Sequence, residues 1–508
     1  MNDEAPALLT RARRAEDQGR MAEALNAYQA AFEASGHDPV LAGDLGRVAL
    51  RLGMHDVAEQ LLRLYLTTAP DSVEGRAYLA HALREQHRHH EAIDLLRQAI
   101  GARPDDPALW TDLGVVRVRQ GEPESALTFL DEALRLQPRY GRALYYRAHA
   151  RADLGDHRSA CADYAAARGA AGLDAGDQVR IDLAEALSRL GLGEFEAGWR
   201  LYDARLSAAS AKPQRFEVEG APYDFAQGPA GLRGRSLLLI AEQGLGDEVM
   251  FAGLIPDVIR ALGPQGRLAL AVEPRLRTLF ARSFPGAEAV AHKTRLEGGV
   301  AVRSVPRLRT PAEAWAPFAA PARAFRRTAE AFPASPGYLK PDPERTAHWR
   351  RWLAGRPGRK VGLLWKSAKL GGDRRRQFAA FDAWAPVLKT PGVTFVNLQY
   401  GEVAEELALA RRGFGADILE PAGIDLKDDL DEVAALAAAL DLTVGFSNAS
   451  FNLAGAVGAP LWLMAPEHAW TMLGTGGYPW YPQARVFTAP AGDWSPALLD
   501  AAEALAAL

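Results

Sequence analysis

The feature that most constrains the fold is a 34-residue period that runs through the first third of the chain. Alanine recurs with this spacing at Ala24, Ala58, Ala92, Ala126 and Ala160. Two further columns keep step, one of small residues (Ala12, Gly46, Ala80, Gly114 and Ala148) and one of large residues (Tyr28, Leu62, Leu96, Leu130 and Tyr164). Glycine follows at Gly19, Gly53, Gly121 and Gly155, with His87 in the corresponding place of one unit. Small residues let two helices approach and glycine turns the chain between them, so each unit is predicted to be a helical hairpin.

A period of this length with these columns is typical of tetratricopeptide repeats. Five units tile residues 5–174, and a sixth, displaced by three residues, covers about residues 175–208. We therefore predict an α-helical tetratricopeptide solenoid over residues 1–208. Such arrays present a concave surface to another protein, so the rest of the chain is expected to act on a protein.

Helical periodicity places a group of aromatic and basic side chains along the inner helices of neighbouring repeats. They are Tyr78, His81, Arg84, Arg142, Tyr145, Tyr146 and His149. Aromatic and arginine side chains are common anchors at interfaces, which makes this group the candidate binding site for a protein acceptor. The alternative is that several of them, the tyrosines included, pack between repeats.

Length and composition narrow the class of protein. A chain of 508 residues is too long for a single core and suggests about three domains. The net charge of −4 gives no sign of nucleic-acid binding, and a single cysteine, Cys161, excludes a disulfide framework and a cysteine-based metal site. The N-terminus lacks the features of a secretory signal, and no apolar run approaches the roughly 18 residues that cross a bilayer. We expect a cytoplasmic protein with no membrane insertion and no bound metal.

From residue 236 the pattern changes to short apolar runs that alternate with amphipathic stretches. Strands are expected at residues 236–241, 268–272, 361–365, 394–398, 418–419, 442–445 and 461–464. Runs of this length suit strands buried on both faces of a parallel sheet. Two successive βα series, over residues 209–355 and 356–508, predict two doubly wound Rossmann-like sheets that face each other. In one version of this prediction the last helix of the chain packs back on the first half. Ligands in such folds bind beyond the carboxyl ends of the strands.

The loop Glu242-Gln-Gly-Leu-Gly-Asp247 lies at such an end, between a strand and a helix. Gly244 and Gly246 allow a sharp turn and the close approach of a ligand. Asp247 is either a catalytic base or the N-cap of the helix, and both interpretations stay open at this point. The full dinucleotide fingerprint is absent because position 249 is valine.

A second loop follows the first strand of the second half. Lys366 comes directly after that strand, and Ser367, Lys369 and Arg374 belong to the small and basic segment that continues from it. This composition suits the phosphate of a nucleotide or the carboxylate of a ligand. The alternative is a solvated basic loop.

A third loop follows the strand at residues 442–445 and opens a helix. Its polar residues are Ser447, Asn448, Ser450 and Asn452. Hydroxyl and amide groups at a helix start bind anions without a charged side chain, although they also cap helices. The acidic run at residues 428–431 is expected to cap the next helix rather than to bind a metal.

At these loops the chain resembles a known family. The motifs are Glu242-Gln-Gly-Leu-Gly-Asp-Glu-Val-Met-Phe251, Val361-Gly-Leu-Leu-Trp365, residues 447–460 and Trp480-Tyr-Pro482. Together they resemble bacterial tetratricopeptide-fused glycosyltransferases of the heptosyltransferase-like kind, which have the two-sheet fold called GT-B. The resemblance covers essentially the entire chain. It is closest to the branch that modifies flagellin, such as enzymes that attach pseudaminic acid to it before export.

The resemblance implies roles for individual residues. The family's glycine–aspartate pair falls on Gly246 and Asp247, which makes Asp247 the expected base, and its phosphate-contacting position falls near Lys366. The late Asp-Thr-x-x-x-His motif of the wider family is replaced by Ser447, Asn448 and Asn452. Loss of that acid and histidine disfavours a nucleoside-diphosphate heptose donor and is compatible with a CMP-activated nonulosonic acid.

The function implied is inverting O-glycosyl transfer to Ser or Thr of flagellin, without a metal or other cofactor. Residues 209–355 would form the acceptor side and residues 356–508 the nucleotide-sugar side, with Lys369 or one of the arginines 374–376 (Arg374, Arg375 or Arg376) pairing with the donor carboxylate. Two alternatives remain open. One is a repeat scaffold whose transferase half has lost activity, and the other is a transferase that acts on a surface glycan.

Overall fold

The structure is a computed structural model of the chain, and it describes all residues except 1–3, 171–172, 368–375 and 491. The chain forms two compact units. The first comprises Met1–Asp153 and Ala162–Leu173, and the second comprises Leu154–Cys161 and Asp174–Leu508. None of the helices within the described residues is both long and apolar enough to span a bilayer.

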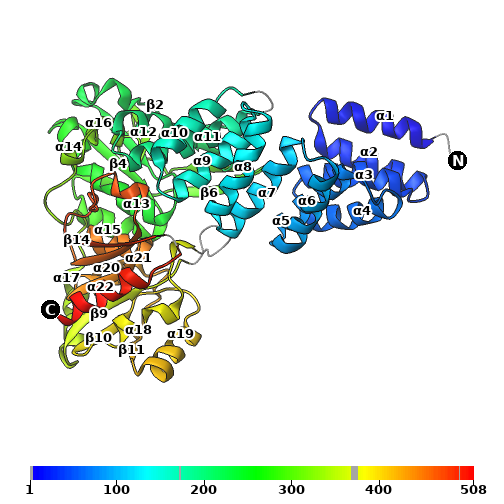
Figure 1. The fold of residues 1–508 in the computed structure, drawn as a ribbon. Helices are drawn as coiled ribbons and strands as arrows, with labels where there is room; N and C mark the ends of the chain where they lie inside the picture. The colour runs from blue at the N-terminus through cyan, green and yellow to red at the C-terminus, as the bar shows by residue number, and fades with distance from the viewer. Residues whose placement is uncertain (1–3, 171–172, 368–375, 491) are drawn as a thin grey trace. The chain divides into compact units, whose positions relative to one another are not determined.

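The first unit consists of the helical hairpins that the period predicts, coloured from blue to cyan in Figure 1. Its helices are α1 (Glu4–Asp17), α2 (Met21–Ala34), α3 (Pro39–Arg51), α4 (His55–Thr68), α5 (Val73–Glu85), α6 (His89–Ala102), α7 (Pro107–Gln120), α8 (Pro123–Leu136), α9 (Gly141–Asp153) and α10 (His157–Ala167), the last shared with the second unit. The predicted solenoid of helix pairs is confirmed.

The structure explains why small and large residues recur at fixed positions of the repeat. A β-carbon at Gly114 would stand 2.6 Å from Leu130 Cγ, and one at Gly46 would stand 2.9 Å from Leu62 Cγ. The small residue of one helix therefore receives the large residue of its partner helix in the same hairpin. At the turn between the helices, His87 adopts a positive φ of 61° in the place where the other units have glycine.

A further column became visible in the structure. Asp38, Ser72 and Asp106, again 34 residues apart, are the N-caps of α3, α5 and α7. Their side chains accept hydrogen bonds of 2.9, 3.0 and 2.9 Å from backbone N–H groups of the first turn. These bonds satisfy donors that a helix start leaves without an intrahelical partner, and so they fix where each inner helix begins.

The second unit contains two parallel sheets and one small mixed sheet. Their strand orders are β2-β8-β3-β4-β5, β11-β10-β9-β12-β13-β14 and β1-β7-β6. The strands are β1 (Gln214–Glu217), β2 (Ala221–Pro222), β3 (Ser236–Ile240), β4 (Arg267–Val272), β5 (Ala287–Ala291), β6 (Lys293–Glu297), β7 (Val300–Ser304), β8 (Ala314–Pro317), β9 (Arg359–Leu364), β10 (Val393–Asn397), β11 (Ile418–Leu419), β12 (Leu442–Phe446), β13 (Leu461–Pro466) and β14 (Ala484–Ala489). All seven strands expected from the apolar runs form at the expected places.

The helices of the second unit alternate with these strands. They are α11 (Ala175–Gly191), α12 (Phe195–Tyr202), α13 (Leu245–Phe251), α14 (Ile255–Leu262), α15 (Arg277–Ser283), α16 (Ala322–Phe325), α17 (Pro343–Ala354), α18 (Ala385–Leu388), α19 (Ala404–Leu409), α20 (Leu430–Ala437), α21 (Ala449–Ala456) and α22 (Ser495–Ala506).

The six-stranded sheet is covered by helices on both faces, as predicted for a doubly wound sheet. Val361 and Leu363 of β9 pack in one core with α18 and α22, and Leu364 packs in the other with α20 and α21. The option that α22 returns to the first half is wrong. Its apolar face, which includes Leu498 and Leu505, packs on the six-stranded sheet instead.

The five-stranded sheet differs from the prediction on one face. Leu237 and Leu239 of β3 point to the helical core, whereas Leu238 and Ile240 point to a small core that Phe216 of β1 helps to cover. The short sheet β1-β7-β6 thus takes the place of a second helical layer. Its strands carry many charged residues, and residues 293–304 gave no apolar run by which to predict them.

The sixth helical pair, α11 and α12, belongs to the second unit rather than to the solenoid. Trp199 of α12 is buried in the α/β core, and its indole N–H donates a 2.7 Å hydrogen bond to the carbonyl of Arg326. This explains why the sixth unit departs from the repeat pattern, since its side chains serve a different neighbour.

Candidate functional site

Two of the predicted loops meet in the second unit. Helix α13, which follows β3, packs against α21, which follows β12. A β-carbon at Gly246 would stand 3.1 Å from Asn452 Nδ2 and 3.5 Å from the backbone nitrogen of Ala449. The glycine therefore permits a close contact between the carboxyl ends of the two parallel sheets, which is where a ligand was expected.

Asp247 lies at this contact, half-buried in the first turn of α13. The N-cap of the helix is Gly244, so the interpretation of Asp247 as N-cap is wrong. A β-carbon at Gly244 would stand 3.3 Å from Asp247 Oδ2, which shows that the carboxylate turns back toward the helix start. The helix dipole favours a negative charge in this position.

Three tyrosines, Tyr202, Tyr478 and Tyr481, lie within electrostatic reach of Asp247. Burial, with the charge of Asp247 adding to it, raises the pKa of Tyr478 to about 12 and holds those of Tyr202 and Tyr481 well above their usual range. Their hydroxyls therefore stay protonated and act as donors. Tyr481 donates to Asn452 Oδ1 at 3.0 Å. The sequence analysis did not predict Tyr202 and Tyr478 as site residues, because both are far from Asp247 along the chain.

A buried ion pair lies directly under the loop. Glu242 accepts two hydrogen bonds from the Arg205 guanidinium, at 3.0 and 3.2 Å, and one from the backbone N–H of Phe318 at 3.0 Å. The hydroxyl of Tyr202 donates to Gln243 Oε1 at 2.7 Å. The end of α12 and the segment that follows it thus fix both residues that precede the glycines.

The next residue, Glu248, is buried on the other side of α13. Burial raises the pKa of Glu248 to about 8, although it accepts a 2.9 Å hydrogen bond from the backbone N–H of Glu273. Glu273 itself adds to the rise and Arg303 opposes it. At neutral pH Glu248 is therefore mostly a neutral acid that ties α13 to the end of β4.

The loop after β9 is only partly described, since Lys369 and Arg374 lie outside the described residues. Lys366 Nζ donates to the carbonyl of Glu402 at 2.7 Å and pairs with Glu406, while Ser367 is half-buried. Buried Gln399 accepts the backbone N–H groups of residues 365 and 366. The lysine is thus held toward α19, and its role as a phosphate contact stays a prediction.

The loop after β12 divides into exposed and buried polar groups. Asn448 is the N-cap of α21, accepts a 3.0 Å hydrogen bond from the backbone N–H of Phe451 and donates to the carbonyl of Lys366 at 3.4 Å. Ser450 and Asn452 are buried, whereas Ser447 is exposed and Asn448 half-exposed. Ser447 and Asn448 are therefore the members of this group that a ligand can reach directly.

The acidic run at residues 428–431 lies at the start of α20, as expected, with Asp431 in its first turn, but its N-cap residue makes no side-chain hydrogen bond to the helix start. Asp429 is the N-cap of α20 but accepts from the backbone N–H of Asp425 outside the helix. Asp428 instead pairs with Arg275 at 3.0 Å, and Asp431 pairs with Arg282. Both arginines come from the first half of the unit, so these acids tie the two halves together.

The predicted acceptor residues lie in the first unit on α5 and α9, which are separated by α7 and so do not belong to neighbouring repeats. Asp112 of α7 interacts with residues on both helices, because it pairs with Arg142 of α9 at 2.5 Å and lies within electrostatic reach of His81 of α5. Asp112 was missed because a single acid on a helix gives no signal in sequence. Arg84 is buried and pairs with Glu85 at 2.7 Å.

Aromatic rings gather around α9. Tyr145 contacts Tyr146, His149 and Tyr164, with ring centroids 5.1, 4.7 and 6.2 Å apart. Tyr78 packs against a core cluster that extends from α3 to α7. Each of these side chains except Tyr164 is only half-buried, so they both pack and offer surface.

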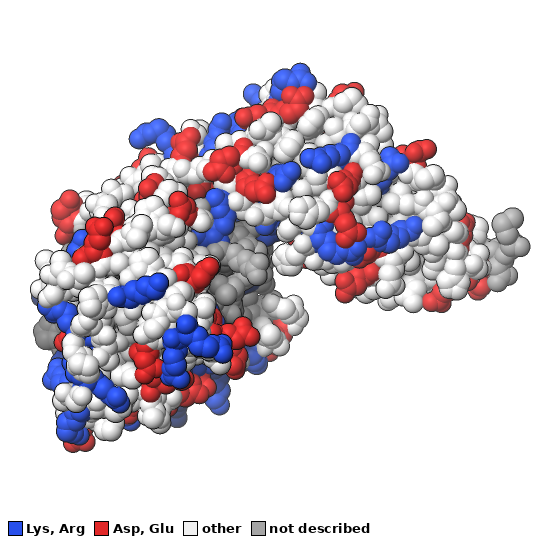
Figure 2. Space-filling model, turned by 60° about the horizontal axis from the view of Figure 1, so that its bottom comes forward, with Lys and Arg blue, Asp and Glu red and all other residues white. Residues whose placement is uncertain are grey.

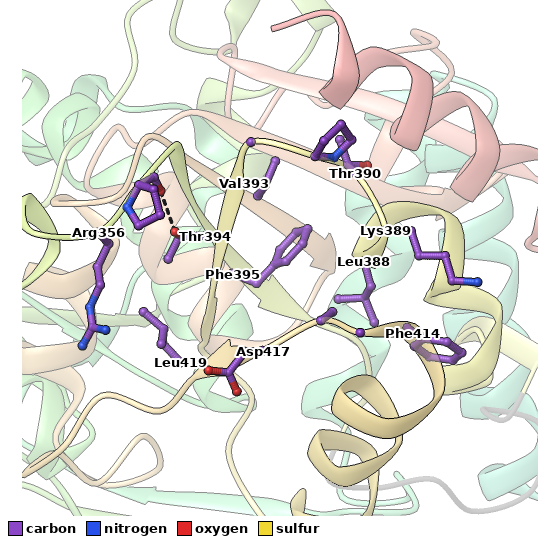
Figure 3. Close-up of a pocket in the computed structure, with 15 residues that line it drawn as sticks. Arg356, Leu388, Lys389, Thr390, Val393, Thr394, Phe395, Phe414, Asp417 and Leu419 are labelled. Carbon is purple, nitrogen blue, oxygen red and sulfur yellow. Dashed lines mark hydrogen bonds between the residues drawn. The ribbon is translucent and has the colours of Figure 1, made fainter.

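A cavity of about 470 Å³ opens elsewhere in the second unit, at the amino ends of β9 and β10 (Figure 3). Phe395, Leu388 and Leu419 line it, and the hydroxyl of Thr394 donates a 2.6 Å hydrogen bond to the carbonyl of Pro357. Because ligands of parallel sheets bind at the opposite, carboxyl end, this cavity is separate from the loops described above.

On the face drawn in Figure 2, basic and acidic residues are interspersed. Within the described part of the chain, no three or more His, Cys, Asp and Glu residues gather in a way that could hold a metal ion.

The fold and these loops define a tetratricopeptide-repeat protein with a second unit of two parallel sheets. A tetratricopeptide repeat family model matches residues 15–82 and 83–152. The protein FlbA of Caulobacter vibrioides is 46% identical over 495 residues, which cover 96% of this chain and 82% of that protein. The chain therefore belongs to the FlbA family.

Two other similarities each cover a smaller part of the chain. The peroxisomal targeting signal receptor of Eremothecium gossypii is 27% identical over 117 residues, 22% of this chain and 20% of that protein. The solved structure of TTC0263, a tetratricopeptide protein of Thermus thermophilus, is 24% identical with a TM-score of 0.32, and the match covers 35% of this chain and 98% of that one.

Proposed function

We propose that this chain is a GT-B glycosyltransferase that moves a nonulosonic acid of pseudaminic acid type from a CMP donor to Ser or Thr of flagellin before export. The donor, the acceptor and the GT-B assignment rest on the family resemblance. The observation that carries the catalytic part is the contact between the loop after β3 and the loop after β12. In this contact Gly246, the residue before Asp247, lies against Ala449 and Asn452 of α21, at the carboxyl ends of two parallel sheets.

The reaction would be a direct displacement. The hydroxyl oxygen of the acceptor forms a bond to the anomeric carbon of the sugar, and the bond from that carbon to the phosphate oxygen of CMP breaks with its electron pair leaving on the phosphate. Asp247 takes the hydroxyl proton, a contribution worth about 10²–10⁴-fold. The start of α21 at Asn448 and the cationic Lys366 would stabilise the charge on the departing phosphate. The scheme uses no metal ion.

The environment of Asp247 supports a base rather than a passive acid. Tyr202, Tyr478 and Tyr481 stay protonated and do not compete for the proton, and the hydroxyls of Tyr202 and Tyr481 hold Gln243 and Asn452 by hydrogen bonds. The buried pair of Arg205 and Glu242 holds the loop from below. A preorganised loop of this kind lowers the cost of aligning donor and acceptor.

The test is the variant Asp247→Asn in a transfer assay with flagellin and a CMP-activated nonulosonic acid, read by the mass of flagellin. Transfer should be lost while affinity for CMP, measured by calorimetry, stays within about threefold, because a base acts on the acceptor and not on the nucleotide. Asp500→Asn, an exposed change on α22, is the matched control and should leave both unchanged. A fully active Asp247→Asn variant contradicts the assigned base.

A second candidate is a repeat scaffold without transferase activity. Its support is that several donor-side groups are already engaged within the protein, Lys366 by Glu406 and Asn452 by Tyr481. A scaffold would bind the protein partner but no nucleotide. Nucleotide binding by the purified chain therefore separates the two candidates.

A further inference from the structure

The repeats carry a cluster of partly exposed side chains whose charges are already neutralised within the protein. It consists of His81 and Glu85 on α5, Asp112 on α7, and Arg142, Tyr145, Tyr146 and His149 on α9, and we call it the inner cluster. Arg142 pairs with Asp112 at 2.5 Å, and Glu85 pairs with Arg84 at 2.7 Å. A cation that already has a carboxylate partner at this distance offers little to an incoming acidic group, because the new ion pair must replace the old one.

The remaining groups of the cluster are suited to neutral contacts. Tyr145 lies between Tyr146 and His149, with ring centroids 5.1 and 4.7 Å away, and the Arg142 guanidinium lies 6.0 Å above the ring of Tyr146. Tyrosine hydroxyls and imidazole nitrogens each donate or accept single hydrogen bonds. Burial, with nearby arginines adding to it, lowers the pKa of both His81 and His149 to about 4, so both rings are uncharged at neutral pH.

We infer that the inner cluster binds an uncharged protein segment rich in amide, hydroxyl and apolar side chains, and that ion pairs contribute little to this recognition. The inference deepens the proposed function, since it rests on the proposal that the repeats bind the protein acceptor, and it names the chemistry of the segment bound. An acidic or basic tail would find its counter-charges already occupied on Asp112, Arg142 and Glu85.

The salt dependence of binding follows directly. Exposed ion pairs weaken as ionic strength rises, whereas hydrogen bonds and aromatic contacts respond little. Binding of the segment should therefore change less than about threefold between about 50 and 500 mM salt, a range in which the Debye length falls severalfold.

The experiment selects ligands without assuming which protein is bound. Short random peptides displayed on phage are selected on the immobilised full-length chain. The enriched peptides are then synthesised, and their dissociation constants are measured by fluorescence anisotropy against the full chain at low and high salt. We expect enriched peptides with near-zero net charge and the small salt dependence given above.

Variants of His81 make the test sharper, because the side chain of this residue is 40% exposed and tolerates substitution. His81→Gln keeps a neutral hydrogen-bonding group and should bind within about threefold of the parent, whereas His81→Lys adds a third cation beside Arg84 and Arg142 and should weaken binding at least about tenfold. His90→Lys, an exposed change on α6, is the matched control and should have no effect. Circular dichroism checks that each variant keeps its helices.

Several results would overturn the inference. They are enrichment of strongly acidic or basic peptides, binding that weakens more than about tenfold with salt, tighter binding by His81→Lys, or no enrichment at all. Binding of purified flagellin is measured separately on the same chain. If flagellin fails to bind while neutral peptides behave as expected, the proposed acceptor is wrong and the inferred chemistry of the cluster stands.

Discussion

The buried acid beside the proposed base gives a prediction whose size follows from the structure. Glu248 lies in α13, directly after Asp247, and burial raises its pKa from an ordinary value of 4.5 to about 8. A raised pKa means that the folded protein holds this proton more tightly than the unfolded chain does. The free energy of unfolding must therefore fall as pH rises, starting above about pH 4.5 and ending above about pH 8.

The magnitude is set by the distance between the two pKa values. At about 1.4 kcal/mol for each pH unit, the full loss from this one group is about 5 kcal/mol. Between pH 6 and 9, where the fold can be studied conveniently, the expected loss is about 2–3 kcal/mol. Glu248→Gln keeps the shape and the acceptor for the backbone N–H of Glu273 but cannot ionise, so it should remove this part of the pH dependence.

The assay is urea unfolding at several pH values, followed by tryptophan fluorescence. Of the 11 tryptophans, all but Trp110 belong to the second unit, so the signal reports the unit that contains Glu248. The stability of Glu248→Gln relative to the parent should rise by about 2–3 kcal/mol from pH 6 to 9. Glu405→Gln, an exposed change on α19, should show no such trend. A difference between Glu248→Gln and the parent that stays constant over this range would contradict the raised pKa of Glu248.

Two further predictions concern stability. Arg205→Met leaves Glu242 as a buried charge without its partner and should lower the free energy of unfolding by about 3–5 kcal/mol in the same assay. Adding Glu242→Gln to this variant should recover much of the lost stability. A loss below about 1 kcal/mol for Arg205→Met would contradict the assigned ion pair. His87→Gly removes a left-handed non-glycine residue from a repeat turn and should stabilise the first unit by about 0.5–1 kcal/mol by circular dichroism, whereas Gly121→Ala at the matching turn should destabilise it. Destabilisation by His87→Gly would show that the ring has a packing role there.

The elements that sequence predicted are those with a period or a continuous apolar run. The hairpins of the solenoid follow from columns such as Gly114 against Leu130, which place one contact in every unit. Strands β3 and β9 are buried on both faces and therefore read as apolar runs. Strand β6 is exposed throughout and carries charges at both ends, so it gave neither a run nor an alternation.

The loops of the candidate site follow from local sequence signals, whereas the residues that pack around these loops do not. Gly246 and Asp247 were found because glycine and acid follow a strand end, a local signal. Tyr202 ends α12 and Arg205 lies in the segment that follows it, and their contact with residues 242–243 depends on tertiary packing alone. The same is true of α22, whose apolar face shows that it packs but not on which sheet.

The central claim is that the second unit binds a CMP-linked donor at the loops after β3, β9 and β12. The most direct test is thermal unfolding of the chain, followed by tryptophan fluorescence, with CMP, UDP, ADP and GDP in turn. At about 100 times its dissociation constant a ligand adds about 2.7 kcal/mol, which should raise the midpoint of a unit of this size by about 3–5 °C. We expect a shift with CMP alone. A shift with UDP or ADP instead would contradict the donor, and no shift with any nucleotide would contradict the transferase.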